Sequence, residues 1–205
     1  MLAGGAPLAA QRSAGLRVTL PDPISRVTVD GPVVTAHDML AGSRIRENLA
    51  AGFPARFHFR VELWTGGVFN NLERSLEYDV LVRYIALEKA YQVWLLDKDV
   101  APFSLGKYTN ADDAERAVAR PRRVPITAPA GKRSMYYRVT LAADNLQLSD
   151  LDELNRWLRG EVQPAIRGDR NAGTGISRAL RSILLRVLGG STSEYAEISK
   201  SFQLP

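Results

Sequence analysis

The chain has 205 residues, of which 45% are hydrophobic and 24% charged, and its formal net charge is +5. This length supports one sizeable core, and the composition excludes wholesale disorder and collagen-like repeats. The sequence contains no cysteine, which excludes disulfide scaffolds, thiol catalysis and zinc–thiolate sites.

The N-terminal segment 1–11 reads MLAGGAPLAAQ, which is uncharged, apolar and rich in small residues. This composition is typical of the end of a secretory signal peptide. We expect a signal-peptide remnant or a disordered tail there, followed by a single β-rich globular domain over 12–205. The segment predicts a periplasmic or otherwise extracytoplasmic location, with association to a membrane as a further expectation.

Alternating apolar and polar residues predict the first elements. Segment 16–20 indicates a strand, and segments 27–29 and 33–35 flank the turn dipeptide Asp30–Gly31, which predicts a hairpin. Over 39–51 the apolar period changes to that of a helix, so we expect a helix after this first hairpin.

The clearest strands lie in the middle of the chain, at 57–63, 76–84, 91–95 and 135–141. In each of them one face is apolar and the other carries polar or charged residues. We therefore expect one face of the sheet to form the core and the other face to be solvated.

A short helix is expected after Asn110, whose side chain can cap 111–119. The segment 120–133 that follows combines three prolines and a glycine with several basic residues. Proline cannot donate to a sheet ladder, so this segment predicts an edge strand or an exposed loop.

Two helices are predicted near the C-terminus, at 149–160 and 174–189, followed by a strand over 198–204 that returns to the sheet. The fold class is therefore mainly β (α+β). It is an antiparallel, β-sandwich-like sheet with one helix after the first hairpin and two C-terminal helices.

Residues 52–64, which include Arg56-Phe-His-Phe-Arg-Val-Glu-Leu-Trp64, and residues 84–93 resemble a family of exported bacterial proteins. The family is catalogued as a domain of unknown function, number forty-three ninety in words. Segment 199–204 is similar to its closing strand, so the resemblance spans most of the chain from about Leu16, although the insertion at 120–133 departs from the pattern. The resemblance implies a secreted or periplasmic protein and carries no catalytic residue.

Local signatures of chemistry are missing from the sequence. His37 and His58 lie on different predicted elements without an acidic cluster spaced for a metal, and no serine occupies a G-x-S-x-G turn. The glycine-rich segment 168–175 precedes a helix but lacks the lysine of a P-loop, which favours a linker. We expect no enzyme activity, no metal and no cofactor.

We therefore expect an extracytoplasmic, non-catalytic interaction or structural module, such as an accessory subunit of a membrane-associated protein complex. Its expected partner is a protein, with an anionic membrane surface as a further contact of the basic helix 174–188 and no nucleic acid. The candidate interaction residues share an aromatic or basic side chain: Trp64, Trp94, Arg120, Arg122, Arg123, Lys132, Arg133, Arg178, Arg181 and Arg186.

Two other functions stay open. In the first alternative the protein carries a lipid or other apolar ligand, in a cavity lined by Phe57, Phe59, Tyr78 and Val80. A filled core and an exposed aromatic or arginine-rich face would favour the interaction module instead. In the second alternative a hydrolase site forms in space, with His58 facing a serine and a carboxylate.

Overall fold

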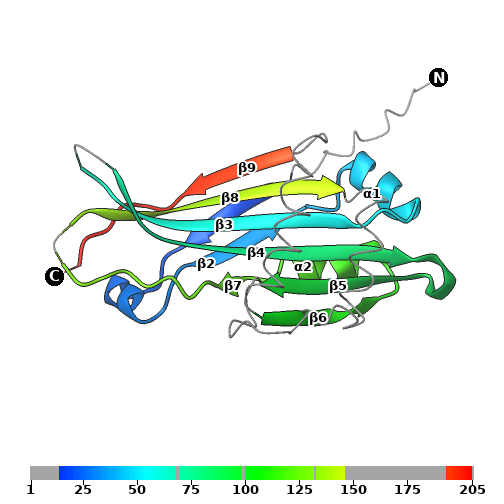
Figure 1. Cartoon of the computed structure of the whole chain (residues 1–205), viewed down its shortest axis with the longest axis horizontal. Helices are drawn as coiled ribbons and strands as arrows, with labels where there is room; N and C mark the ends of the chain where they lie inside the picture. The colour runs from blue at the N-terminus through cyan, green and yellow to red at the C-terminus, as the bar shows by residue number, and fades with distance from the viewer. Residues whose placement is uncertain (1–13, 68–69, 98–99, 132, 146–192, 205) are drawn as a thin grey trace, which may run out of the picture.

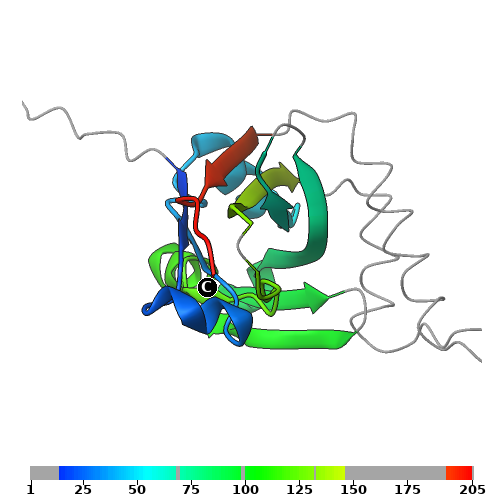
Figure 2. The same cartoon turned by 90° about the vertical axis from the view of Figure 1, so that its left-hand side faces the viewer.

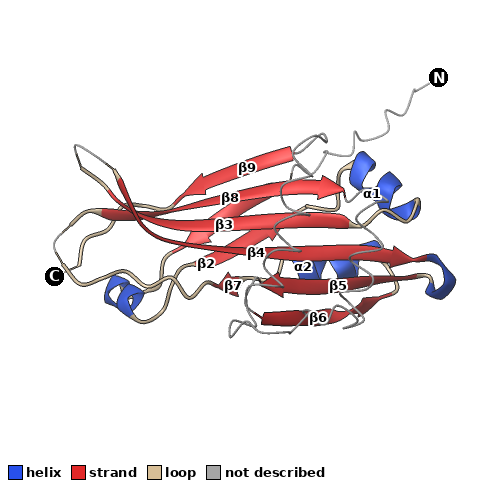
Figure 3. Cartoon of the chain, viewed as in Figure 1, coloured by secondary structure: helices blue, strands red, loops and turns tan. Residues whose placement is uncertain are grey.

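The computed structural model describes residues 14–67, 70–97, 100–131, 133–145 and 193–204 (Figure 1). Within these ranges the chain is mainly β, with two antiparallel sheets and two α-helices (Figure 3). The prediction of a mainly β fold is confirmed. No helix of the described ranges is long and apolar enough to cross a membrane.

The larger sheet has six strands in the spatial order β6-β5-β4-β3-β8-β9. Its centre is β3, which pairs along its whole length with both β4 and β8. The residues of β3 alternate, so Phe57 and Phe59 lie on the inner face and are almost fully buried. The strand bounds are β3 (Ala55–Thr65), β4 (Asn71–Ile85), β5 (Ala90–Asp97), β6 (Val100–Tyr108), β8 (Met135–Asn145) and β9 (Ser193–Ile198).

The smaller sheet consists of β1 (Gly15–Thr19), β2 (Val33–His37) and β7 (Arg122–Arg123), in the order β1-β2-β7. The segment 120–133 thus contributes a short edge strand, as its prolines predicted. Figure 2 shows that the larger sheet curves, with β9 (red) at the top, green strands at the bottom and β1 (dark blue) across the open side. Residues of both sheets share one hydrophobic core.

The predicted hairpin around Asp30–Gly31 is wrong. Ile24–Thr28 forms a 3-10 helix, in which the Arg26 amide donates to the Pro23 carbonyl oxygen at 3.0 Å. Val27 anchors this turn because it is completely buried. The Val29 and Asp30 amides donate to the Arg26 carbonyl oxygen, and the Val27 carbonyl oxygen accepts the Ala128 amide at 3.0 Å. The segment is therefore not a hairpin strand, and β2 pairs with β1 instead.

The helix expected over 39–51 is shorter, because α1 spans Ser43–Ala50. The residues before it are held by α2 (Ala111–Val118), whose Glu115 carboxylate accepts the backbone amides of Met39 at 3.0 Å and Leu40 at 2.5 Å. The helix α2 itself confirms the expected cap, since the Asn110 side chain accepts the amide of Asp113 at 2.8 Å.

The outer face of the larger sheet is not uniformly solvated, which corrects the expectation of one wet face. Arg56 and Asp79 are only 5% and 6% exposed, and Leu81 is fully buried although it lies outside the main core cluster. Alternation along a strand fixes which residues share a face, but it does not fix whether that face meets water.

The remaining elements differ in how well the sequence predicted them. The edge strand β6 was missed, because Pro102 and Gly106 interrupt its alternation. The chain does return to the sheet near its end, but the strand predicted over 198–204 is misplaced: β9 ends at Ile198, and the segment after it contributes only a bridge between Phe202 and Met135. The segment 1–11 and both predicted C-terminal helices lie outside the described residues.

Candidate functional site

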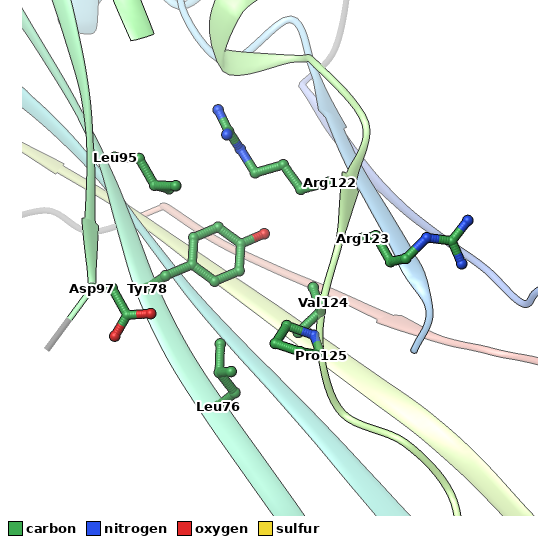
Figure 4. Close-up of a pocket in the computed structure, with 8 residues that line it drawn as sticks. All are labelled: Leu76, Tyr78, Leu95, Asp97, Arg122, Arg123, Val124 and Pro125. Carbon is green, nitrogen blue, oxygen red and sulfur yellow. The ribbon is translucent and has the colours of Figure 1, made fainter. Parts of the chain in front are cut away.

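A pocket of about 290 Å³ opens between the inner face of the larger sheet and the β7 edge of the smaller sheet (Figure 4). The strand order explains its position, because β7 is an edge strand of only two residues and leaves part of β4 and β5 uncovered. The lining residues are Leu76 and Tyr78 of β4, Leu95 and Asp97 of β5, and Arg122, Arg123, Val124 and Pro125.

The Tyr78 hydroxyl is the least satisfied polar group of this pocket. The Tyr78 ring stacks on Phe59, with centroids 4.7 Å apart and an interplanar angle of 7°, and the residue is 8% exposed. Its hydroxyl has no hydrogen-bond partner among the described residues. A buried polar group without a partner costs about 1–3 kcal/mol.

Burial raises the pKa of Tyr78 well above its usual range, and the positive charge of Arg122 only partly opposes this shift. The phenol is therefore neutral at ordinary pH and keeps its proton. The Tyr78 hydroxyl is consequently a hydrogen-bond donor with no acceptor in this part of the structure.

Arg122 brings a positive charge to the same end of the pocket. Its Nη2 donates to the carbonyl oxygen of Ala117, at the C-terminal turn of α2, over 3.2 Å. Burial lowers the pKa of Arg122, the nearby Arg120 adds to that shift, and Tyr78 opposes it only in its ionised form. A guanidinium carries five N–H donors, so Arg122 keeps donors for a ligand.

Arg123 points to the other side of β7, away from the pocket interior (Figure 4). Its guanidinium lies 3.6 Å from the Asp30 carboxylate, which also pairs with Arg26 at 2.6 Å. Successive residues of a strand point to opposite faces, so Arg123 also lines the pocket but its guanidinium points away from it.

Asp97 lies on the other side of the Tyr78 ring from the Arg122 guanidinium (Figure 4). The walls between these ends are apolar and come mainly from Leu76, Leu95 and Val124. The pocket therefore has a donor-rich, positive end, an apolar middle and an acidic end.

The candidate interaction residues are not gathered into one site. Trp64 and Trp94 are half-buried on the outer face, where the Trp64 Nε1 donates to Glu62 at 3.0 Å. Arg120 is exposed beside the pocket, and Arg133 is exposed near a second pocket of about 440 Å³ that also contains Glu73. The remaining candidates lie outside the described residues: Lys132, Arg178, Arg181 and Arg186.

His58 lies on the outer face of β3, where its side chain is 21% exposed. Its Nδ1 lies 2.8 Å from the Asp79 Oδ1, and the Arg56 Nη2 donates to the same oxygen at 3.1 Å. The strand register causes this contact, since His58 and Asp79 are direct cross-strand partners. The described part of the chain shows no serine hydrogen-bonded to His58 and no cluster of three potential metal ligands.

No family model, no curated protein and no solved structure matches this chain. The resemblance to the exported bacterial family therefore stays a prediction.

Sequence reasoning named Tyr78 as a lining residue of the carrier cavity, but it did not predict that the Tyr78 hydroxyl lacks a partner among the described residues. One signal was present, because a buried tyrosine normally needs a partner for its hydroxyl. Arg122 was among the candidates, but nothing in the sequence connects it to a residue 44 positions earlier.

Proposed function

We propose that this protein is a non-catalytic binding module that holds a small, largely apolar ligand between its two sheets. The observation that carries the proposal is the Tyr78 side chain, which lines the pocket and whose buried hydroxyl has no partner among the described residues. Polar groups that converge in an apolar pocket are typical of ligand sites. The half-buried Arg122 guanidinium is the second such group.

This function is the carrier alternative of the sequence analysis, with a changed location. Phe57, Phe59 and Val80 are buried in the packed core and do not line the pocket. The ligand lies instead at the open side of the sandwich-like arrangement, where Tyr78 marks the border of the core. Such a position leaves a route from solvent to the site.

A thermal-shift comparison tests the binding function. Small apolar acids, alcohols and amides are offered to the wild-type protein, and a ligand at about 100 times its Kd stabilises the folded state by about 2.7 kcal/mol. The matched variant Leu76→Trp fills the pocket from the β4 wall and is expected to lose the stabilisation. Equal stabilisation of both proteins would contradict a site in this pocket.

A protein partner is the second candidate function, and the edge strand β6 supports it. β6 pairs with β5 alone among the described strands, so no described strand covers its outer edge. Phe103 on this edge is 64% exposed and lies opposite Leu95, a wall residue of the pocket. An open edge with an exposed aromatic residue suits the addition of a partner strand.

Affinity purification from native membranes tests whether a protein partner binds at the β6 edge. The wild-type protein is expected to retain a partner of fixed stoichiometry that the variant Phe103→Glu loses while it keeps its melting temperature. Recovery of the wild-type protein as a free monomer counts against this candidate.

The proposal includes the extracytoplasmic location and the membrane-associated complex expected from the sequence. Their support is the composition of segment 1–11 and the resemblance to exported proteins. Fractionation of the source cells tests the location, and recovery of the protein with the cytoplasmic fraction contradicts it.

A further inference from the structure

The structure points to a specific ligand chemistry for the pocket between β4, β5 and β7. We propose that the pocket binds a free monocarboxylic acid with a short apolar tail, with the carboxylate held by Arg122 and Tyr78. This inference rests on the proposed binding function and names the ligand class of the same site.

The donors at the positive end fit a carboxylate. An ionised carboxylate only accepts hydrogen bonds, through two oxygens. The Tyr78 hydroxyl supplies one donor without a partner among the described residues, and the Arg122 guanidinium supplies a planar fork. One ligand group therefore satisfies the buried phenol and neutralises the half-buried cation.

The charges around the pocket limit the ligand to one negative charge. Of the two arginines among the described lining residues, Arg122 directs its side chain toward Tyr78 in Figure 4 and Arg123 does not, while Asp97 lies at the opposite side of Tyr78. A second carboxylate at the far end of the ligand would approach Asp97, and like charges repel. A doubly charged phosphate at the near end would exceed the charge of one guanidinium.

The size of the pocket limits the tail. A volume of about 290 Å³ equals that of about ten water molecules in the liquid, at about 30 Å³ each. A ligand that fills this volume has about ten non-hydrogen atoms, which is the size of octanoate. Its tail lies against Leu76, Leu95 and Val124, whose side chains are aliphatic.

Titration of the full chain with sodium octanoate tests the proposal. Nuclear magnetic resonance follows the methyl groups of Leu76 and Leu95 and the Nε–H of Arg122, and calorimetry gives the Kd. Octanoate is expected to shift all three signals. Octanamide and the dicarboxylate suberate are expected to bind at least about tenfold more weakly than octanoate. Octanamide has no negative charge for Arg122, and the second carboxylate of suberate is repelled by Asp97. Each difference is expected to cost about 1.5–3 kcal/mol.

Two variants and one matched control test whether the ligand carboxylate binds at Arg122 and Tyr78. Arg122→Gln and Tyr78→Phe are each expected to raise the Kd for octanoate by about 10- to 100-fold. Arg26→Gln removes the same charge from a residue that pairs with Asp30 and does not line the pocket, and is expected to leave the Kd within about twofold.

The outcomes separate this inference from the proposed function. Octanamide that binds as tightly as octanoate, with no effect of Arg122→Gln, overturns the carboxylate and leaves the binding function standing. An acetylated peptide ending in leucine that binds more tightly than octanoate overturns the free acid as the source. If no tested compound moves the Leu76 and Leu95 signals, both the inference and the proposed function fail.

Discussion

The imidazole of His58 and the carboxylate of Asp79 face each other across β3 and β4, with 2.8 Å between Nδ1 and Oδ1. A carboxylate only accepts, so the Nδ1 donates. Arg56 donates to the same oxygen, and the Arg56 and Asp79 side chains are 6% and 8% exposed. Asp79 is therefore the shared acceptor of two donors on a largely buried surface.

Replacing Asp79 by asparagine is expected to lower the free energy of unfolding by about 3 kcal/mol, because it leaves the buried Arg56 cation uncompensated. The matched control is Glu77→Gln on the same strand face, whose partner Arg60 is 3.6 Å away and 45% exposed. That exposed pair contributes less than about 1 kcal/mol. Denaturant unfolding measures both variants, and equal losses would contradict a buried Arg56–Asp79 pair.

Replacing tyrosine by phenylalanine is expected to have opposite effects on stability at Tyr78 and at Tyr137. Tyr78→Phe removes a buried hydroxyl that lacks a partner among the described residues, so the unfolding free energy of the ligand-free protein is expected to rise by about 1 kcal/mol. Tyr137→Phe removes a hydroxyl that donates to the Ile126 carbonyl oxygen at 2.7 Å, and is expected to cost about 1–3 kcal/mol. A loss of stability in Tyr78→Phe would mean that its hydroxyl has a partner.

The Glu115 carboxylate links α2 to the segment before α1, because it accepts the backbone amides of two residues there. Glu115→Ala is expected to cost about 2 kcal/mol, since it leaves the amides of Met39 and Leu40 without their charged acceptor. Amide hydrogen exchange of these two residues is expected to speed up more than exchange in β3. The control Asp112→Ala, at an exposed position of the same helix, is expected to cost at most about 1 kcal/mol through the helix dipole.

Alkaline pH is expected to destabilise the fold through its buried tyrosines. Burial raises the pKa of Tyr78 and of Tyr137 above the ordinary value of 10.0. Above pH 10 the unfolded chain releases phenolic protons that the folded chain retains, so stability falls as the pH rises. Unfolding curves across this range measure the fall, and Tyr78→Phe is expected to make it shallower. A pH-independent unfolding free energy above pH 10 would contradict the shifts.

The sequence by itself determined the elements whose signal is local. The strands around Phe57, Tyr78 and Tyr137 follow from strict alternation, and α2 follows from its Asn110 cap, because neighbouring residues decide both patterns. The same local signal failed where the chain was not periodic, as at Pro102 in β6.

Only the tertiary structure decided which strands pair and what each face contacts. The pairing of β1 with β2, the burial of Asp79 beside His58 and the approach of Arg122 to Tyr78 all join residues that lie far apart in the chain. Such contacts depend on sheet order and on the packing of one sheet against another, and no periodicity within a single segment records either of them. Alternation thus assigned Tyr78 to an inner face, whereas the short edge strand β7 made that face the wall of a pocket.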